Sequence, residues 1–167
     1  ILNRQERPSL DDAMKRSLRA LSTDEVLAMQ AAGAQVVDVR DGIDFEGGHL
    51  RGTLNIALSG KYATWAGSML AADAPIVVIA EEGGEEEAVM RLGRIGFDTV
   101  AGFLAGGMNA LSDREDLVER TARITAPALA EWLGGERADA GPPPVVVDVR
   151  SPAEHAAGHL AEAVNIP

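Results

Sequence analysis

The 167-residue chain is 46% hydrophobic and 25% charged, as is typical of a globular protein, and its formal net charge of −11 argues against nucleic acid or an anionic membrane as a partner. It contains no cysteine, which excludes a disulfide framework, a thiolate metal site and a cysteine nucleophile within this sequence. No stretch approaches the roughly 20 apolar residues of a membrane span, and no basic-then-apolar start indicates a signal peptide, so we expect a cytoplasmic protein.

The first part of the chain predicts a linker followed by helices and strands in alternation. Residues 1–19 are polar and are expected to form a leading linker. Ser22 and Glu25 make an S-x-x-E capping box, which predicts a helix over 23–32. The β-branched run at 35–39 then predicts a buried strand. A short helix at 41–47 and a second strand at 53–57 are expected to follow.

The next part continues the alternation. A helix is expected at 60–70, and the run "PIVVIA" at 75–80 is the most apolar of the predicted strands, which favours a central place in a sheet. Residues 85–95 have one apolar helical face. A strand at 99–104 and a last helix after a glycine pair complete the pattern. The sequence therefore predicts an α/β fold, a parallel five-stranded sheet with helices on both faces.

Two segments of the chain match each other at a constant offset of 110 residues. "VVDVRDGIDFEGGHLRGTLNI" begins at residue 36, and "VVDVRSPAEHAAGHLAEAVNI" begins at residue 146. The offset pairs Asp38, Arg40, His49 and Asn55 with Asp148, Arg150, His159 and Asn165. An offset of this length is the size of a small domain and too long for a solenoid repeat.

The repeat predicts a division of the chain into four parts. After the leading linker, residues 20–112 are expected to form a complete domain, 113–123 a helical linker without a strand, and 124–167 the N-terminal half of a second copy. The chain starts at Ile1 and stops directly after a predicted strand, so we expect a piece of a longer protein, in which other domains or another protomer cover the half domain.

The repeated D-V-R, G-H-L and N-I motifs resemble the rhodanese homology domain, the family of the thiosulfate and 3-mercaptopyruvate sulfurtransferases. The strand–loop–helix at 76–97 and the stretch "LAGGMNAL" at 104–111 carry the same resemblance. It implies the rhodanese fold. It also implies a catalytic cysteine at the carboxyl end of the central strand, followed by a loop whose N–H groups and arginine hold the sulfur anion.

The position that matches the family's cysteine is Ala80, which has no functional group that could attack sulfur. The arginine position holds a glutamate near Glu85. We therefore expect no catalytic residue, metal or cofactor in this segment. We also expect a degenerate active-site loop made of Glu81, Glu82, Gly83, Gly84, Glu85, Glu86 and Glu87.

Three interpretations of these glutamates are open. Carboxylates in the first helical turn are stabilised by the helix dipole, by about 0.3–1 kcal/mol each, and this interpretation is favoured. Oxygen ligands from Glu81, Glu82, Glu85 and Glu86 could hold a hard cation, although the spacing is unlike an EF-hand. The acidic surface could also dock a partner.

Two interpretations are also open for the two histidines of the second copy. His155 and His159 are four residues apart, which can chelate a metal on a helix. However, His159 repeats His49, and His155 falls on Phe45, so a structural histidine bound to backbone near a turn is favoured. Asp38 and Arg40 are expected to form a structural ion pair at the strand end.

A narrower resemblance concerns the glutamate-rich segment 79–111 together with "YATWAG" before it. These residues look like the cysteine-less rhodanese domain of fusions with a metallo-β-lactamase-fold persulfide dioxygenase, whose non-haem iron lies in a domain outside this sequence. The favoured hypothesis is thus a catalytically silent structural, docking or channelling module. The alternative is a sulfurtransferase whose cysteine lies in the remainder of the second domain. A rhodanese-fold phosphatase is disfavoured because it also needs the loop cysteine.

Overall fold

The computed structural model describes residues 17–136 and 141–167. The chain divides into two compact units, with the boundary between Ala122 and Arg123. They are called the first unit and the second unit. The predicted linker at 1–19 lies largely outside the described residues.

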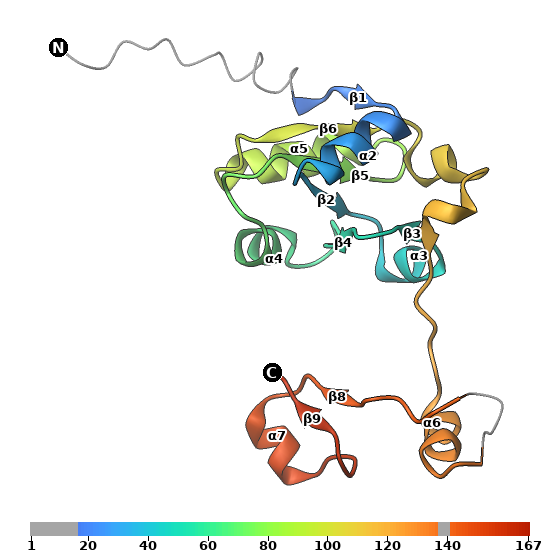
Figure 1. Cartoon of the computed structure of the whole chain (residues 1–167). Helices are drawn as coiled ribbons and strands as arrows, with labels where there is room; N and C mark the ends of the chain where they lie inside the picture. The colour runs from blue at the N-terminus through green and yellow to red at the C-terminus, as the bar shows by residue number, and fades with distance from the viewer. Residues whose placement is uncertain (1–16, 137–140) are drawn as a thin grey trace. The chain divides into compact units, whose positions relative to one another are not determined.

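The first unit is built on a five-stranded sheet in the order β1-β6-β5-β2-β4 (Figure 1). All four strand pairs are parallel. The strands are β1 (Ala20–Leu21), β2 (Gln35–Asp38), β4 (Leu54–Asn55), β5 (Ile76–Ile79) and β6 (Val100–Leu104). The central strand is β5, and all four of its residues are buried. The predicted fold class and central strand are confirmed.

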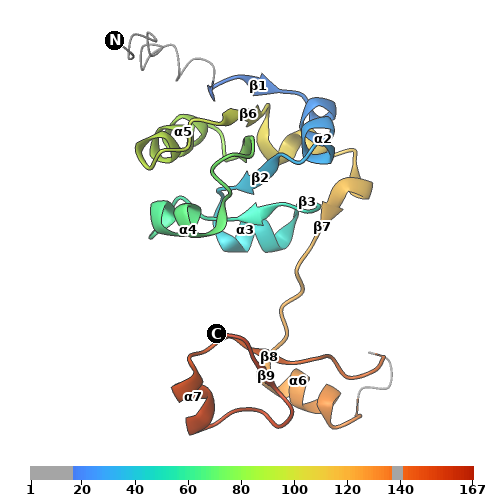
Figure 2. The same cartoon turned by 60° about the vertical axis from the view of Figure 1, so that its left-hand side comes forward.

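Helices cover both faces of this sheet (Figure 2). One face packs against α4 (Tyr62–Met69) and α5 (Glu85–Arg94), whose buried residues share a cluster with Val37 and Val78. The other face packs against α2 (Thr23–Ala31) through Val26. The fully apolar β5 follows from this arrangement, because side chains on both of its faces meet helices.

Local signals in the sequence account for where the helices begin. The Ser22 hydroxyl accepts from the Glu25 N–H, and the Glu25 carboxylate accepts from the Ser22 N–H, so the predicted capping box starts α2. α3 (Gly42–Gly47) is the short helix expected between the first two predicted strands.

Two short strands and one helix of the first unit differ from the prediction. The expected strand-free helical linker at 113–123 is wrong, because 3₁₀ helix η2 (Glu115–Leu117) is followed by strand β7 (Val118–Glu119). β7 pairs antiparallel with β3 (His49–Leu50), which was also not predicted. The last predicted helix is the 3₁₀ helix η1 (Gly107–Leu111). Two-residue strands carry no periodicity of their own, so only their pairing partners reveal them.

The second unit contains α6 (Ala126–Leu133), β8 (Val147–Asp148), α7 (Pro152–Ala157) and β9 (Val164–Asn165). β8 and β9 form a two-stranded parallel sheet. Their register repeats that of β2 and β4, since Val147 faces Val164 as Val37 faces Leu54. Across both described ranges, the model has no helix with the length and apolar character needed to traverse a membrane.

Candidate functional site

A buried ion pair marks the carboxyl end of β2. Nη2 of Arg40 donates to Oδ2 of Asp38 at 2.6 Å, and Nε donates to Oδ1 at 3.0 Å. Both side chains are buried. The same guanidinium donates to the Gly48 carbonyl at 2.8 Å, and Nδ2 of Asn55 donates to the carbonyls of Asp38 and Arg40 at 3.0 and 2.9 Å. These four residues, which we call the strand-end motif, join β2, the end of α3 and β4.

His49 lies next to the strand-end motif, directly after Gly48. Its Nδ1 donates to the Phe45 carbonyl at 2.8 Å, and its ring stacks on that of Phe45 with centroids 3.8 Å apart. The histidine is buried. With one nitrogen donating to backbone and one ring face against Phe45, its contacts are those of a packing residue.

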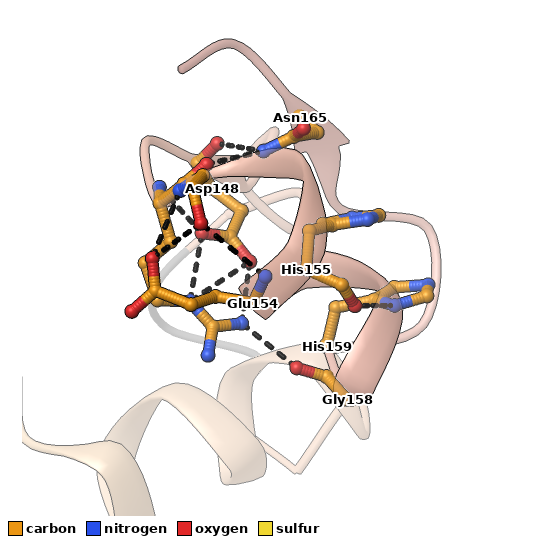
Figure 3. Close-up of polar contacts among 8 residues, drawn as sticks. Asp148, Glu154, His155, Gly158, His159 and Asn165 are labelled. Carbon is orange, nitrogen blue, oxygen red and sulfur yellow. Dashed lines mark hydrogen bonds and ion pairs between the residues drawn. The ribbon is translucent and has the colours of Figure 1, made fainter.

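The second unit repeats the strand-end motif with Asp148, Arg150, Gly158 and Asn165 (Figure 3). Nη2 of Arg150 donates to Oδ2 of Asp148 at 2.6 Å and to the Gly158 carbonyl at 2.8 Å. Hydrogen bonds from the Arg150 side chain and backbone hold the pKa of Asp148 well below its usual value. This pair, unlike that of Asp38 and Arg40, keeps Arg150 half exposed.

The two histidines of the second unit lie parallel to each other. The rings of His155 and His159 stack with centroids 3.8 Å apart, and Nδ1 of His159 donates to the His155 carbonyl at 2.9 Å (Figure 3). His155 therefore takes the place that Phe45 has in the first unit. In the described ranges no three histidine, aspartate or glutamate side chains are grouped closely enough to hold a metal ion.

Ala80 ends the central strand and is buried. The following loop and the turn after β6 both close over it. A Cβ on Gly84 would lie 3.5 Å from the Ala80 Cβ, and a Cβ on Gly107 would lie only 2.6 Å from the Ala80 carbonyl oxygen. Gly107 also has a φ of +53°. Both the short contact and the positive φ therefore require glycine at this position. The glycine pair at 106–107 was noted in the sequence, but its contact with Ala80 was not predicted.

The loop after Ala80 is organised around a carboxylate. Gly83 has a φ of +87°, and its N–H donates to Oε2 of Glu85 at 2.9 Å. The Gly84 N–H donates to the Glu81 carbonyl at 2.9 Å. The loop N–H groups at positions 83 and 84 are thus satisfied within the chain. A negative charge from Glu85 is fixed beside the start of α5, where Glu86 and Glu87 add two more acidic side chains.

Arg91 of α5 is engaged away from the loop backbone. Its Nη1 donates to the Leu58 carbonyl at 2.7 Å and to Oε1 of Glu87 at 3.1 Å. Its guanidinium carbon lies 4.9 Å from the centre of the Tyr62 ring. The pair with Glu87 is solvent-exposed on the glutamate side, so we assign it little stabilisation. The Leu58 and Tyr62 contacts were not predicted, because they join segments more than 25 residues apart.

Two hollows lie near the carboxyl edge of the sheet. The first, about 450 Å³, lies on α5. It is lined by Gly83, Glu86, Glu87, Met90, Arg91 and Arg94. Ala80 is not among these residues, so the hollow is not lined by the end of the central strand. The second, about 280 Å³, contains the exposed side chains of Trp65 and Met69 together with Lys61.

The family model of the rhodanese-like domain matches residues 22–114 of the chain. No curated protein matches this chain. The matched range contains the whole parallel sheet except β1, and it includes Ala80 and the glutamate-rich loop.

Solved structures share the fold at low sequence identity. The Alr3790 protein from Anabaena sp. is 24% identical with a TM-score of 0.51, over 59% of this chain and 90% of that one. Thiosulfate sulfurtransferase from Pseudomonas aeruginosa is 18% identical with a TM-score of 0.53, over 92% of this chain but 34% of that one. The anaerobic ergothioneine biosynthesis enzyme from Chlorobium limicola is 17% identical with a TM-score of 0.53, over 89% of this chain and 41% of that one. At these identities the likeness concerns the fold.

Proposed function

The chain belongs to the rhodanese-like domain family, and from this premise we propose that residues 20–112 form a catalytically silent rhodanese domain within a larger sulfur-metabolism protein. The observation that carries the proposal is the buried methyl group of Ala80 at the carboxyl end of β5. Sulfur transfer by this family needs a thiolate at that point, and alanine offers no nucleophile. The domain then serves as a structural, docking or channelling module.

The electrostatics of the loop support the same proposal. An anion site at a helix N-terminus depends on free N–H groups and on positive charge. Here the Gly83 N–H is bound by Glu85, and the first turn of α5 carries three glutamates. Each carboxylate opposes a thiosulfate charge by about 1 kcal/mol at 4 Å even with water-like screening. The loop therefore disfavours a sulfur anion in addition to lacking the nucleophile.

The parent architecture is a further part of the proposal. The glutamate-rich loop resembles the cysteine-less domain of fusions with a metallo-β-lactamase-fold persulfide dioxygenase, and we place the chain in such a fusion. Residues 124–167 form the opening of a second rhodanese domain. The partners are other domains of the parent chain or another protomer. Nucleic acid and membranes are not partners, consistent with the net charge of −11.

A second candidate function follows from the intact strand-end motif of the second unit. Asp148, Arg150, Gly158 and Asn165 are arranged as in the first unit. A complete second domain could then carry the active cysteine, which the offset of 110 places beyond Pro167. The parent protein would in that case be a thiosulfate or persulfide sulfurtransferase, with the first domain as its silent half.

The test is sulfur transfer from thiosulfate to cyanide by four forms of the chain. We expect no turnover by the wild type and little by Ala80→Cys. A third variant that also carries Glu85→Arg, with glutamines at Glu81, Glu82, Glu86 and Glu87, should be more active than Ala80→Cys. Ala80→Ser in the same background is the control, because it has the size of cysteine without a thiolate. Turnover by the wild type would overturn the proposal. Substantial turnover by Ala80→Cys alone would show that only the nucleophile was missing.

A further inference from the structure

The five-stranded sheet of the first unit has an open edge along β4. Among the described strands, β4 stands last in the order and pairs with β2 alone. The N–H groups of Ile56 and Leu58 donate to the carbonyls of Asp38 and Val39, both at 3.0 Å. Alternate residues of a parallel strand face the same neighbour, so the residues between and beside these two donors turn their N–H and C=O groups away from β2.

The groups on the open side belong to Asn55, Ala57 and Ser59. Within the described ranges, Ala57 and Ser59 make no hydrogen bond from backbone to backbone. All three residues also line the second hollow, of about 280 Å³, together with Ile56, Lys61, Trp65 and Met69. The free edge of the sheet is therefore one wall of this hollow, and α4 is the other.

α4 presents two large apolar side chains to the hollow. Trp65 and Met69 lie one helical turn apart and are 56% and 50% exposed. One turn earlier stands Lys61, which carries the only charge among the described residues that line the hollow. A strand that paired with the open edge would cover Trp65 and Met69, because they line the same hollow as the edge.

Opposite charges stand at the two ends of α4. Lys61 precedes the helix and follows the carboxyl end of β4. After the helix, the Ala71 N–H donates to Oε1 of Gln35 at 2.8 Å, and Nε2 of Gln35 donates to the Ala71 carbonyl at 2.9 Å. These bonds hold Asp73 near the amino end of β2. Lys61 and Asp73 are both exposed, and within the described ranges neither has an ion pair.

This charge pattern is complementary to itself. Two copies joined edge to edge across a twofold axis pair their strands antiparallel, because an isologous contact reverses the strand. With Ala57 opposite Ala57 of the partner, Asn55 faces Ser59. The carboxyl end of one sheet then lies beside the amino end of the other, so Lys61 of each copy meets Asp73 of its partner. A second copy thus satisfies the edge, the apolar side chains and both charges.

We propose that this protein forms a homodimer through the outer edge of β4 and the exposed face of α4. The two β4 edges join into one continuous sheet, and Trp65 and Met69 of both copies pack over the junction. Two ion pairs between Lys61 and Asp73 fix the antiparallel register. The inference is independent of the proposed function, since none of these residues belongs to the loop after Ala80.

The test is sedimentation equilibrium of the whole chain and of two charge-reversal variants. Measurement at 0.15 M salt, where the Debye length is about 8 Å, screens the repulsion between two chains of net charge −11 and leaves contact pairs in force. We expect the wild type to dimerise with a dissociation constant of about 100 µM or tighter. Lys61→Glu and Asp73→Lys should each weaken this at least about fivefold, because symmetry turns both ion pairs into like charges.

An equal mixture of the two variants is the matched control. In the mixed dimer every position 61 meets an opposite charge at position 73, and the total charge equals that of two wild-type chains. The mixture should therefore associate within about threefold of the wild type. A change in folding of either variant would not produce this rescue.

A second pair of variants tests the strand edge itself. Ala57→Pro removes an N–H that points away from β2, so the sheet of the monomer is kept while dimerisation weakens at least about tenfold. Ala57→Ser keeps the N–H and should dimerise within about threefold of the wild type. Unchanged amide signals of Val26 and Val78 confirm that both variants are folded. The proposal is overturned by a wild type that stays monomeric at 0.5 mM, a concentration about five times the expected dissociation constant. It is also overturned by equal dimerisation of Ala57→Pro, or by a mixture of the charge variants no stronger than either alone.

Discussion

The two units of this protein contain the same strand-end motif in very different surroundings. Arginine Nη2 lies 2.6 Å from the aspartate and 2.8 Å from the glycine carbonyl in both units. Yet Asp38 and Arg40 are buried, and Arg150 is half exposed. The contacts of the motif are thus local, formed between residues no more than 17 positions apart, whereas its burial depends on the remaining strands of a complete sheet.

The largest expected difference between the units concerns the ion pair. Asp38→Asn keeps the side-chain shape but leaves the buried guanidinium of Arg40 without its counter-charge, which should cost about 3–5 kcal/mol of unfolding free energy. Asp148→Asn makes the same change where water solvates Arg150, and it should leave the second unit close to wild type. Urea unfolding followed by amide signals of each unit measures both. Equal losses in the two units would show that burial does not set the value of the pair.

A cavity-forming substitution tests the apolar side of the comparison. Leu50 is fully buried, and the matching Leu160 is half exposed. Leu50→Ala should destabilise the first unit by about 2–5 kcal/mol, because it removes buried methyl groups and leaves a void. Leu160→Ala should change stability by less than about 0.5 kcal/mol. The same urea series measures both variants. A large loss from Leu160→Ala would mean that its side chain is covered in solution.

Tyr62 provides a smaller effect that reports on the first unit alone. It is the only tyrosine in the chain, and burial raises its pKa well above the ordinary value of about 10. Since the folded-state pKa is the higher one, the contribution of Tyr62 to stability is fully present below about pH 10. It is lost as pH rises from there toward the folded-state value.

Tyrosinate absorbance measures this titration directly. Its midpoint should lie above pH 10 in the native chain and return to about 10 in urea. Tyr62→Phe should make the stability of the first unit fall less steeply above pH 10. At neutral pH it should cost no more than about 1 kcal/mol, since the hydroxyl donates only a long 3.4 Å bond to the Ala88 carbonyl. An ordinary midpoint in the native chain would contradict the burial of this ring.

Several parts of the fold were predictable because their signals are local. The capping box of Ser22 and Glu25, the apolar run of β5 and the amphipathic α5 each depend on residues within a short window. The alternation of these elements was enough to predict a parallel sheet with helices on both faces. The pairing of β3 with β7 was not predictable, since each has two residues and they lie about 70 positions apart.

The candidate site likewise has some features that the sequence predicts and others that depend on the tertiary structure. The sequence alone determined that Ala80 ends the most apolar run, that glutamates follow it, and that one motif occurs twice, because these are facts of residue identity and spacing. Only the tertiary structure decided that Glu85 folds back to accept the Gly83 N–H, and that Arg91 is held by Leu58 and Tyr62. It also decided that Val37 and Val39 are buried, whereas the matching Val147 and Val149 are exposed. The physical reason is that a side chain's burial and partners depend on which distant segments pack against it, whereas its local hydrogen bonds depend on its neighbours in the chain.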